Sequence, residues 1–150
     1  MKYFTVLSIR MLTVAIALAT GSIVGAQSLN FSRHETERAC SNRTLFGDYG
    51  VKIEGTLLGP NWPLRTLALF HFDGRGGIST RSHVVLNGMP PAEEWATAAG
   101  SYAMNPDCTG SGSIEAAPPI PFHLVVVNGG REFYLVVDGN AITGEGRTMD

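Results

Sequence analysis

Apolar and polar residues alternate along most of the chain from residue 46 onward, as they do in strands that bury one face. In the first such segment Tyr49, Val51 and Ile53 fall on one face, whereas Lys52 and Glu54 fall on the other. Turn residues recur about every ten positions, which is typical of an all-β domain. The pattern predicts eight strands, at residues 47–58, 64–73, 77–86, 96–104, 110–116, 121–127, 131–137 and 141–149.

The connections between these strands favour antiparallel neighbours. Asp73-Gly74, Asn128-Gly129 and Asp138-Gly139 are pairs that accept the positive φ of tight hairpin turns. Eight strands joined in this way can close into a barrel, which leaves no exposed sheet edge. We therefore predict an all-β fold, an eight-stranded antiparallel up-and-down barrel. A two-sheet β-sandwich is the alternative, because loop length alone does not exclude it.

Three of the predicted strands are apolar on both faces. In the strand at 64–73, Leu67 and Leu69 lie opposite Ala68, Phe70 and Phe72. In the strand at 121–127, Val125 and Val127 lie opposite Phe122, Leu124 and Val126. In the strand at 131–137, Val136 lies opposite Leu135 and Val137. The outer apolar side chains of a closed barrel need a cover, since large exposed apolar patches are rare on monomers. We expect this cover to be the segment around Leu29 and Phe31, or a second subunit in a homo-oligomer.

The first 26 residues have the layout of an export signal. Lys2 and Arg10 precede an apolar run from Met11 to Leu18, and small residues follow as far as Ala26. The run is shorter than the roughly 20 residues that a membrane-spanning helix needs, so a cleaved signal is favoured over an anchor. We predict a signal helix at 1–26, an N-terminal arm at 27–45 and a β-barrel domain at 46–150. The predicted location is secreted or periplasmic, with no stable membrane anchor after cleavage.

The charge balance argues against one class of partner. Removing Lys2 and Arg10 with the signal leaves nine basic and 13 acidic side chains, a formal charge of −4. Binding to nucleic acid depends on a basic surface that neutralises phosphates. We therefore expect no nucleic-acid partner.

The chain has two cysteines, Cys40 and Cys108. Two cysteines in an exported protein pair more often than they stay free, because the destination is oxidising. A disulfide would tie the start of the domain to its middle. The alternatives are a buried free pair and a two-cysteine metal site, and the second lacks His or Cys partners nearby in the sequence.

Several short motifs together resemble a known class of proteins. They are Cys40, Phe46-Gly47-Asp48-Tyr49-Gly50, Phe72-Asp73-Gly74-Arg75-Gly76-Gly77, Gly100-Ser101-Tyr102 and Asn105-Pro106-Asp107-Cys108-Thr109-Gly110. The combination resembles uncharacterised small secreted bacterial β-barrel proteins over most of the chain after the signal. The architecture is similar to calycin-type and allene-oxide-cyclase-type barrels. The resemblance implies a secreted barrel, and it brings no catalytic residue because that class has none assigned.

The residues that could carry metal or acid–base chemistry lack the required spacing. His71 and His123 could share a face, but neither belongs to a His-x-His or His-x-x-x-His pattern. Glu93 and Glu94 are adjacent and point apart. No Gly-x-Ser-x-Gly elbow precedes a helix. We predict no metal, no cofactor and no catalytic residue.

Aromatic side chains are the remaining candidates for a site. The predicted ligand-binding residues are Tyr49, Trp62, Phe70, Phe72, Trp95, Tyr102 and Phe122. Trp62 and Trp95 lie in Pro-rich loops that could flank a barrel mouth, and eight-stranded barrels are wide enough for one small ligand. The competing interpretation is that these rings fill a dry core. The functional hypotheses are binding of a small apolar molecule, a cyclase or isomerase with an aromatic cavity, and a structural or partner-binding module. Glu54 or Arg65 turned inward would favour the enzyme.

Overall fold

The computed structural model describes residues 39–149, and the predicted signal helix lies outside them. Eight strands and two short 3-10 segments follow one another: η1 (Asn42–Thr44), β1 (Phe46–Leu57), β2 (Trp62–Asp73), β3 (Gly77–Leu86), β4 (Ala96–Met104), β5 (Thr109–Ile114), β6 (Ile120–Val127), η2 (Asn128–Gly130), β7 (Glu132–Val137) and β8 (Ala141–Thr148). Within residues 39–149, no helix has the length and apolar character needed to cross a bilayer.

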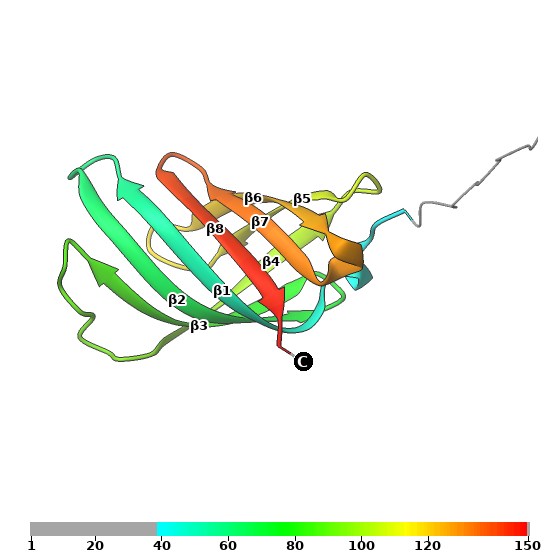
Figure 1. Ribbon diagram of the computed structural model, residues 1–150, viewed down its shortest axis with the longest axis horizontal. Helices are drawn as coiled ribbons and strands as arrows, with labels where there is room; N and C mark the ends of the chain where they lie inside the picture. Colours follow the sequence, from blue (N-terminus) through cyan, green and yellow to red (C-terminus); the bar gives the residue numbers. More distant parts are fainter. Residues whose placement is uncertain (1–38, 150) are drawn as a thin grey trace, which may run out of the picture. The chain divides into compact units, whose positions relative to one another are not determined.

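The strands form a closed antiparallel barrel in which each pairs with its neighbours in the sequence. The ring is completed by β8, which lies beside β1 with Tyr49 opposite Thr148 and Thr56 opposite Ala141 (Figure 1). The predicted up-and-down barrel is confirmed, and the sandwich alternative is excluded. Closure pairs both edges of the sheet, so none of the strands within residues 39–149 offers an open ladder to another chain.

The strand boundaries differ from the predicted ones by at most two residues. β2 begins at Trp62 instead of residue 64, because Trp62 and Pro63 pair with Leu57 and Thr56 and so extend the first hairpin. β5 ends at Ile114 instead of residue 116, where its pairing with Ile120 of β6 ends. The Pro-rich stretch that follows cannot continue the ladder, because proline has no backbone N–H.

Alternation along the strands sorts side chains between the barrel interior and the solvent, as predicted. The buried hydrophobic residues are Leu45, Tyr49, Val51, Ala68, Phe70, Phe72, Ile78, Tyr102, Phe122, Leu124, Val126, Phe133, Leu135 and Ile142. Their partners one residue away, such as Lys52, Leu67 and Val125, face outward.

Two interior glycines make room for large rings. A Cβ atom at Gly146 would clash with the ring of Phe133, which lies directly opposite on β7. A Cβ atom at Gly112 would clash with Phe122, its partner on β6. Only glycine lets a ring lie flat against the opposite strand in this way. The small residues of β5 and β8 therefore fix where the aromatic side chains of β6 and β7 are placed.

Candidate binding cavity

One end of the barrel is filled by an aromatic cluster. Phe72 is fully buried at its centre, and its ring centroid lies 5.3 Å from Tyr49, 5.0 Å from Tyr102 and 5.6 Å from Phe133. All three contacts are edge-to-face, the arrangement that aromatic quadrupoles favour. Phe70 continues the cluster toward the middle of the barrel, 6.3 Å from Phe133. We call this the closed end.

The segment before β1 plugs the closed end. Leu45 is fully buried in the core. Asn42 accepts a hydrogen bond from the backbone N–H of Met104 at 2.8 Å and donates one to the carbonyl of Arg75 at 3.2 Å. The cyan segment therefore lies against the turns at this end, including the orange turn between β6 and β7 (Figure 1). Leu45, the last residue of the predicted N-terminal arm, is thus part of the barrel core.

The disulfide joins this plug to the barrel wall. Cys40 and Cys108 are bonded, with 5.0 Å between their Cα atoms and a separation of 68 positions in the sequence. The backbone N–H of Cys40 also donates to the carbonyl of Pro106 at 3.0 Å. The predicted disulfide is confirmed. Such a bond persists in an oxidising environment, either extracellular or periplasmic.

Two buried tyrosines use their hydroxyl groups to form hydrogen bonds at the closed end, and those of Tyr102 hold the plug. The Tyr102 hydroxyl lies 2.8 Å from the carbonyl oxygen of Asn42 and 3.0 Å from that of Leu45. Tyr49 donates to the carbonyl of Gly130. Burial, followed by the nearby charge of Asp73, raises the pKa of Tyr102 to about 12. Burial also raises the pKa of Tyr49.

The Asp-containing motifs noted in the sequence form turns at the closed end. One carboxylate oxygen of Asp73 accepts hydrogen bonds from the backbone N–H groups of Arg75, Gly76 and Gly77 at 2.7 to 3.0 Å. These bonds favour the charged form and hold the pKa of Asp73 below its usual value. Asp107 is bonded by the hydroxyl and N–H of Thr109 in the same manner, and its pKa is lowered too. The motifs stabilise turns, as expected from their Gly content.

The opposite end of the barrel, the open end, contains an apolar cavity of about 260 Å³. Its walls come from β1, β2, β3, β5, β6, β7, β8 and the turn before β8. The lining residues are Ile53, Leu57, Leu64, Thr66, Ala68, Phe70, Thr80, Ser82, Val84, Ile114, Ile120, Phe122, Leu135, Val137, Asn140 and Ile142. Most are aliphatic, so the cavity offers a surface from which an apolar molecule gains by leaving water.

The polar residues of the cavity wall are all neutral. Thr66 on β2 and Thr80 and Ser82 on β3 bring three hydroxyl groups, and Asn140 lies in the turn before β8. Thr80 donates to the carbonyl of Ala98 at 3.4 Å. Among the described residues that line the cavity, none is titratable. The arrangement can therefore bind and orient a molecule, but it provides no acid or base.

The seven aromatic residues predicted from the sequence are divided among four places. Tyr49, Phe72 and Tyr102 belong to the closed end, whereas Phe70 and Phe122 line the cavity. Trp62 is 39% exposed beside Leu57 at the open end.

Trp95 lies on the outer face of the barrel instead of at the mouth. Its ring centroid is 5.7 Å from the Arg81 guanidinium carbon and 5.7 Å from the His83 ring. Both of these residues point outward from β3. Trp95 also borders a shallow surface depression with Leu67 and Leu69 of β2. Neither Trp62 nor Trp95 is among the residues that line the cavity.

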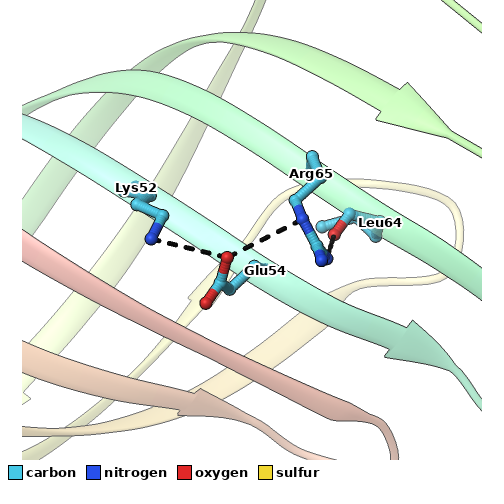
Figure 2. A network of polar contacts seen from close by, with 4 residues as sticks. All are labelled: Lys52, Glu54, Leu64 and Arg65. Atoms are coloured by element: carbon cyan, nitrogen blue, oxygen red, sulfur yellow. Dashed lines mark hydrogen bonds and ion pairs between the residues drawn. The ribbon is translucent and has the colours of Figure 1, made fainter. Parts of the chain in front are cut away.

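Glu54 and Arg65, the charged residues whose inward position would favour an enzyme, lie outside the barrel. Figure 2 shows the Glu54 carboxylate between Lys52, at 3.4 Å, and Arg65, at 3.7 Å. Arg65 also donates to the carbonyl of Leu64 at 2.9 Å. All three charged side chains are largely exposed, where such ion pairs contribute about 0–1 kcal/mol. This network belongs to the surface.

His71 and His123 are also on the surface and lie on different parts of the barrel wall. His71 pairs with Asp48 at 2.7 Å, and His123 pairs with Asp138 at 3.0 Å. Their strands, β2 and β6, are not neighbours, so the two rings do not share a site. In residues 39–149, no group of three or more His, Cys, Asp or Glu side chains is arranged to hold a metal ion.

The outward apolar residues form two exposed faces. Leu67 is 62% exposed and lies near Leu69 and Trp95 on one face. On the other, Val125 and Val136 border a shallow depression with Tyr134. No described residue covers either face. The predicted cover by residues around Leu29 and Phe31 falls outside the described residues, and cover by a second subunit stays a prediction.

The sequence interpretation missed the interior hydroxyl groups and the plug residue Asn42. Thr66 is spaced by two and four residues from Ala68 and Phe70, so it shares their inward face. Thr80 and Ser82 share the inward face of Ile78 and Val84 in the same way. Their inward direction could therefore have been read from the same alternation that identified the core. The role of Asn42 depends on turns distant in sequence, and no local signal reveals it.

Comparison of the chain with protein-family models, with curated proteins and with solved structures finds no match. The barrel and the disulfide agree with the resemblance given above. Many unrelated functions share small barrels, so the fold by itself does not assign one.

Proposed function

We propose that this protein is a secreted or periplasmic binder of a small apolar molecule, which it holds in the open-end cavity. The observation that carries the proposal is the unequal filling of the barrel. Aromatic rings pack the closed end, whereas aliphatic walls at the other end surround about 260 Å³ of space. Small barrels that have no ligand are filled by their own side chains. The disulfide supports the location.

The cavity volume sets the size of the ligand. Pockets for drug-sized molecules occupy about 300–1,000 Å³, so this cavity suits a smaller compound. A cavity of about 150 Å³ lined by similar residues binds benzene, and scaling by volume gives about ten non-hydrogen atoms here. A fused two-ring compound such as 2-methylnaphthalene matches this size.

The rigid closed end supports binding at the open end. The barrel is stapled by a disulfide and by buried hydroxyl bonds at one end, so the strands are held in register without help from the cavity side chains. A cavity that exists before the ligand arrives requires little ordering on binding, and this improves affinity. Catalysis is not part of the proposal, because the lining residues provide no acid or base.

The test is binding of 2-methylnaphthalene by the disulfide-bonded protein, followed by calorimetry and by amide NMR shifts. We expect saturable binding of one molecule, with shifts concentrated around residues such as Phe122, Leu135 and Ile142. The affinity should be in the micromolar range, about −8 kcal/mol. Shifts confined to the outer faces around Leu67 or Val136 would contradict the proposal and would favour the partner-binding hypothesis.

A matched pair of variants on β3 separates cavity binding from surface binding. Ser82 lines the cavity, whereas Ser79 on the same strand is exposed on the outer face. Ser82→Leu should fill part of the cavity and weaken binding at least tenfold, about 1.4 kcal/mol. Ser79→Leu adds the same side chain outside and should leave the affinity unchanged. Equal effects of the two substitutions would overturn the assignment of the cavity.

A further inference from the structure

We infer that the ligand is a neutral molecule with one hydrogen-bonding oxygen, held by the hydroxyl groups of β2 and β3. This inference rests on the proposed function and names the chemistry of its ligand. Three of the four polar lining residues, Thr66, Thr80 and Ser82, lie on one wall, and the fourth, Asn140, already accepts a hydrogen bond from the backbone N–H of Leu58 at 3.3 Å. The aliphatic residues Ile120, Leu135 and Val137 of β6 and β7 also line the cavity. The cavity is therefore two-sided, with a hydrogen-bonding wall and an apolar wall.

Thr66 is the central residue of the polar wall. It is only 7% exposed. The Thr80 hydroxyl is bonded to the carbonyl of Ala98, whereas no hydrogen bond joins the Thr66 hydroxyl to another described residue. In the described residues, every side-chain oxygen or nitrogen atom that is fully enclosed by protein has a hydrogen-bond partner. The Thr66 hydroxyl has no such partner among these residues, so it is not fully enclosed. Because Thr66 lines the cavity, its free hydroxyl faces that space. A polar group in such a place is favourable only when a partner reaches it.

The strand register brings a second hydroxyl within reach of the same partner. Thr66 pairs with Val84 across β2 and β3, so Ser82 is its diagonal neighbour on the same inward face. Diagonal neighbours lie about 7–8 Å apart, which lets a single ligand oxygen approach both side chains. Water can occupy this place when the ligand is absent, and a ligand oxygen reproduces its hydrogen bonds when it replaces that water.

The cavity wall also determines the charge of the ligand. The described lining residues include no Lys, Arg or His that could pair with a carboxylate, and no Asp or Glu that could pair with an amine. An unpaired charge in an apolar site is strongly unfavourable. A hydroxyl or carbonyl oxygen needs only the neutral donors and acceptors that Thr66 and Ser82 offer. The favoured class is thus a small alcohol, phenol, ketone or aldehyde.

Three probes of one ring system test this inference at pH 7: 2-methylnaphthalene, 2-naphthol and 2-naphthoate. The first two have the same number of non-hydrogen atoms and differ in one hydroxyl group. We expect 2-naphthol to bind about 3–10-fold more tightly than 2-methylnaphthalene, as one net hydrogen bond predicts. The anionic 2-naphthoate should bind at least about tenfold more weakly than 2-naphthol.

Thr66→Val removes the hydroxyl group and keeps the shape of the side chain. It should abolish the preference for 2-naphthol and leave the affinity for 2-methylnaphthalene unchanged, which also shows that the cavity is intact. Thr97→Val, on the exposed outer face of β4, is the matched control and should keep the preference. If Thr66→Val fails to fold, Ser82→Ala provides the same comparison with a smaller expected loss.

The outcomes separate this inference from the proposed function. Equal binding of 2-naphthol and 2-methylnaphthalene by the native protein would overturn the hydrogen-bonding wall and leave the apolar site in place. A preference for 2-naphthol that survives in Thr66→Val and in Ser82→Ala would overturn it as well. Failure of both neutral probes to bind would overturn the proposed function and this inference together.

Discussion

The two ends of this barrel are built from the same eight strands and differ in almost every other respect. The closed end holds Phe72, Tyr102 and Phe133 in ring-to-ring contact and is sealed by the segment that carries Cys40. The open end has aliphatic walls around a cavity of about 260 Å³. The first end resembles a protein interior, where packing is dense. The second has the character of a binding pocket, apolar with a few polar groups.

If the proposed function holds, the difference teaches that stability and binding are assigned to separate halves of one small domain. Side chains beside a void have already lost part of their contacts, so they contribute less to stability than side chains packed on all sides. The closed end therefore provides most of the packing energy. The open end is left free to keep a cavity that a fully filled barrel would not have.

The largest effect is expected from truncating a ring at the centre of the closed end. Phe72→Ala should lower the free energy of unfolding by about 3–5 kcal/mol, because it leaves a cavity among three other rings. Leu64→Ala, at the cavity, should cost about 2 kcal/mol or less, since its surroundings are already partly empty. Urea unfolding measures both. Equal losses would show that the two ends are packed equally well.

Removing the disulfide should come next. Cys40→Ser combined with Cys108→Ser frees a loop of 68 residues in the unfolded chain, and the loop-entropy relation gives about 4 kcal/mol. Thermal unfolding measures the loss. Binding of 2-methylnaphthalene below the unfolding temperature should be unchanged, because the cavity is at the other end. A folded double variant that no longer binds would contradict the separation of the two halves.

A smaller effect is expected from one hydroxyl group of the plug. Tyr102→Phe keeps the ring contact with Phe72 and removes the hydrogen bond to the carbonyl groups of Asn42 and Leu45. The free energy of unfolding should fall by about 1–2 kcal/mol, as for a buried acceptor that loses its donor. Denaturant unfolding measures it, and Tyr134→Phe on the exposed outer face is the control. A loss in the control as large as that in Tyr102→Phe would argue against the plug.

Alkaline pH should weaken the closed end through the same residue. The pKa of Tyr102 is about 12 in the folded protein and near 10.0 in the unfolded chain. The folded state therefore keeps a proton that the unfolded state releases, and stability falls as the pH rises from 10.0 through about 12. Tyr49 acts in the same direction. Unfolding measured across this range should show a shallower loss in Tyr102→Phe, and an unchanged slope would contradict the assignment.

The smallest change in the free energy of unfolding is expected at acidic pH, through Asp73. The pKa of Asp73 is lower in the folded protein than its usual 3.8, so its contribution to stability is present above pH 3.8 and is lost as the pH falls through the folded pKa. Asp73→Asn should reduce this acid sensitivity, as measured by unfolding at a series of acidic pH values.

Over pH 5–8, binding of the neutral 2-methylnaphthalene should stay constant, because the described lining residues do not titrate. A pH-dependent affinity would show that a charged group acts on the cavity.

The sequence predicted the barrel well because its signals are local. Alternation around Val51 and Ile53 and the Asp-Gly turns fix strands and hairpins residue by residue, and the structure confirms them to within two residues. Whether the interior is full or empty depends instead on which rings meet across the barrel. Phe133 fits against Gly146 and fills the closed end, and this contact depends on register.

The positions of the two tryptophans illustrate the same limit. Trp62 and Trp95 share similar Pro-rich surroundings in the sequence. Trp62 is drawn into a strand by its pairing with Leu57, whereas Trp95 lies against Arg81 on the outside. The sequence pattern describes the loop, but the direction in which a loop side chain points is decided by the surface that it meets.

The up-and-down order of the strands also has a consequence for how the protein can change. All connections at the cavity end, at residues 58–61, 87–95, 115–119 and 138–140, are hairpin loops that lie far from the disulfide and its plug. Loops of this kind tolerate insertion and replacement better than the strands they join. The entrance could thus be rebuilt by grafting, one loop at a time, and the scaffold could serve as a starting point for engineered binders.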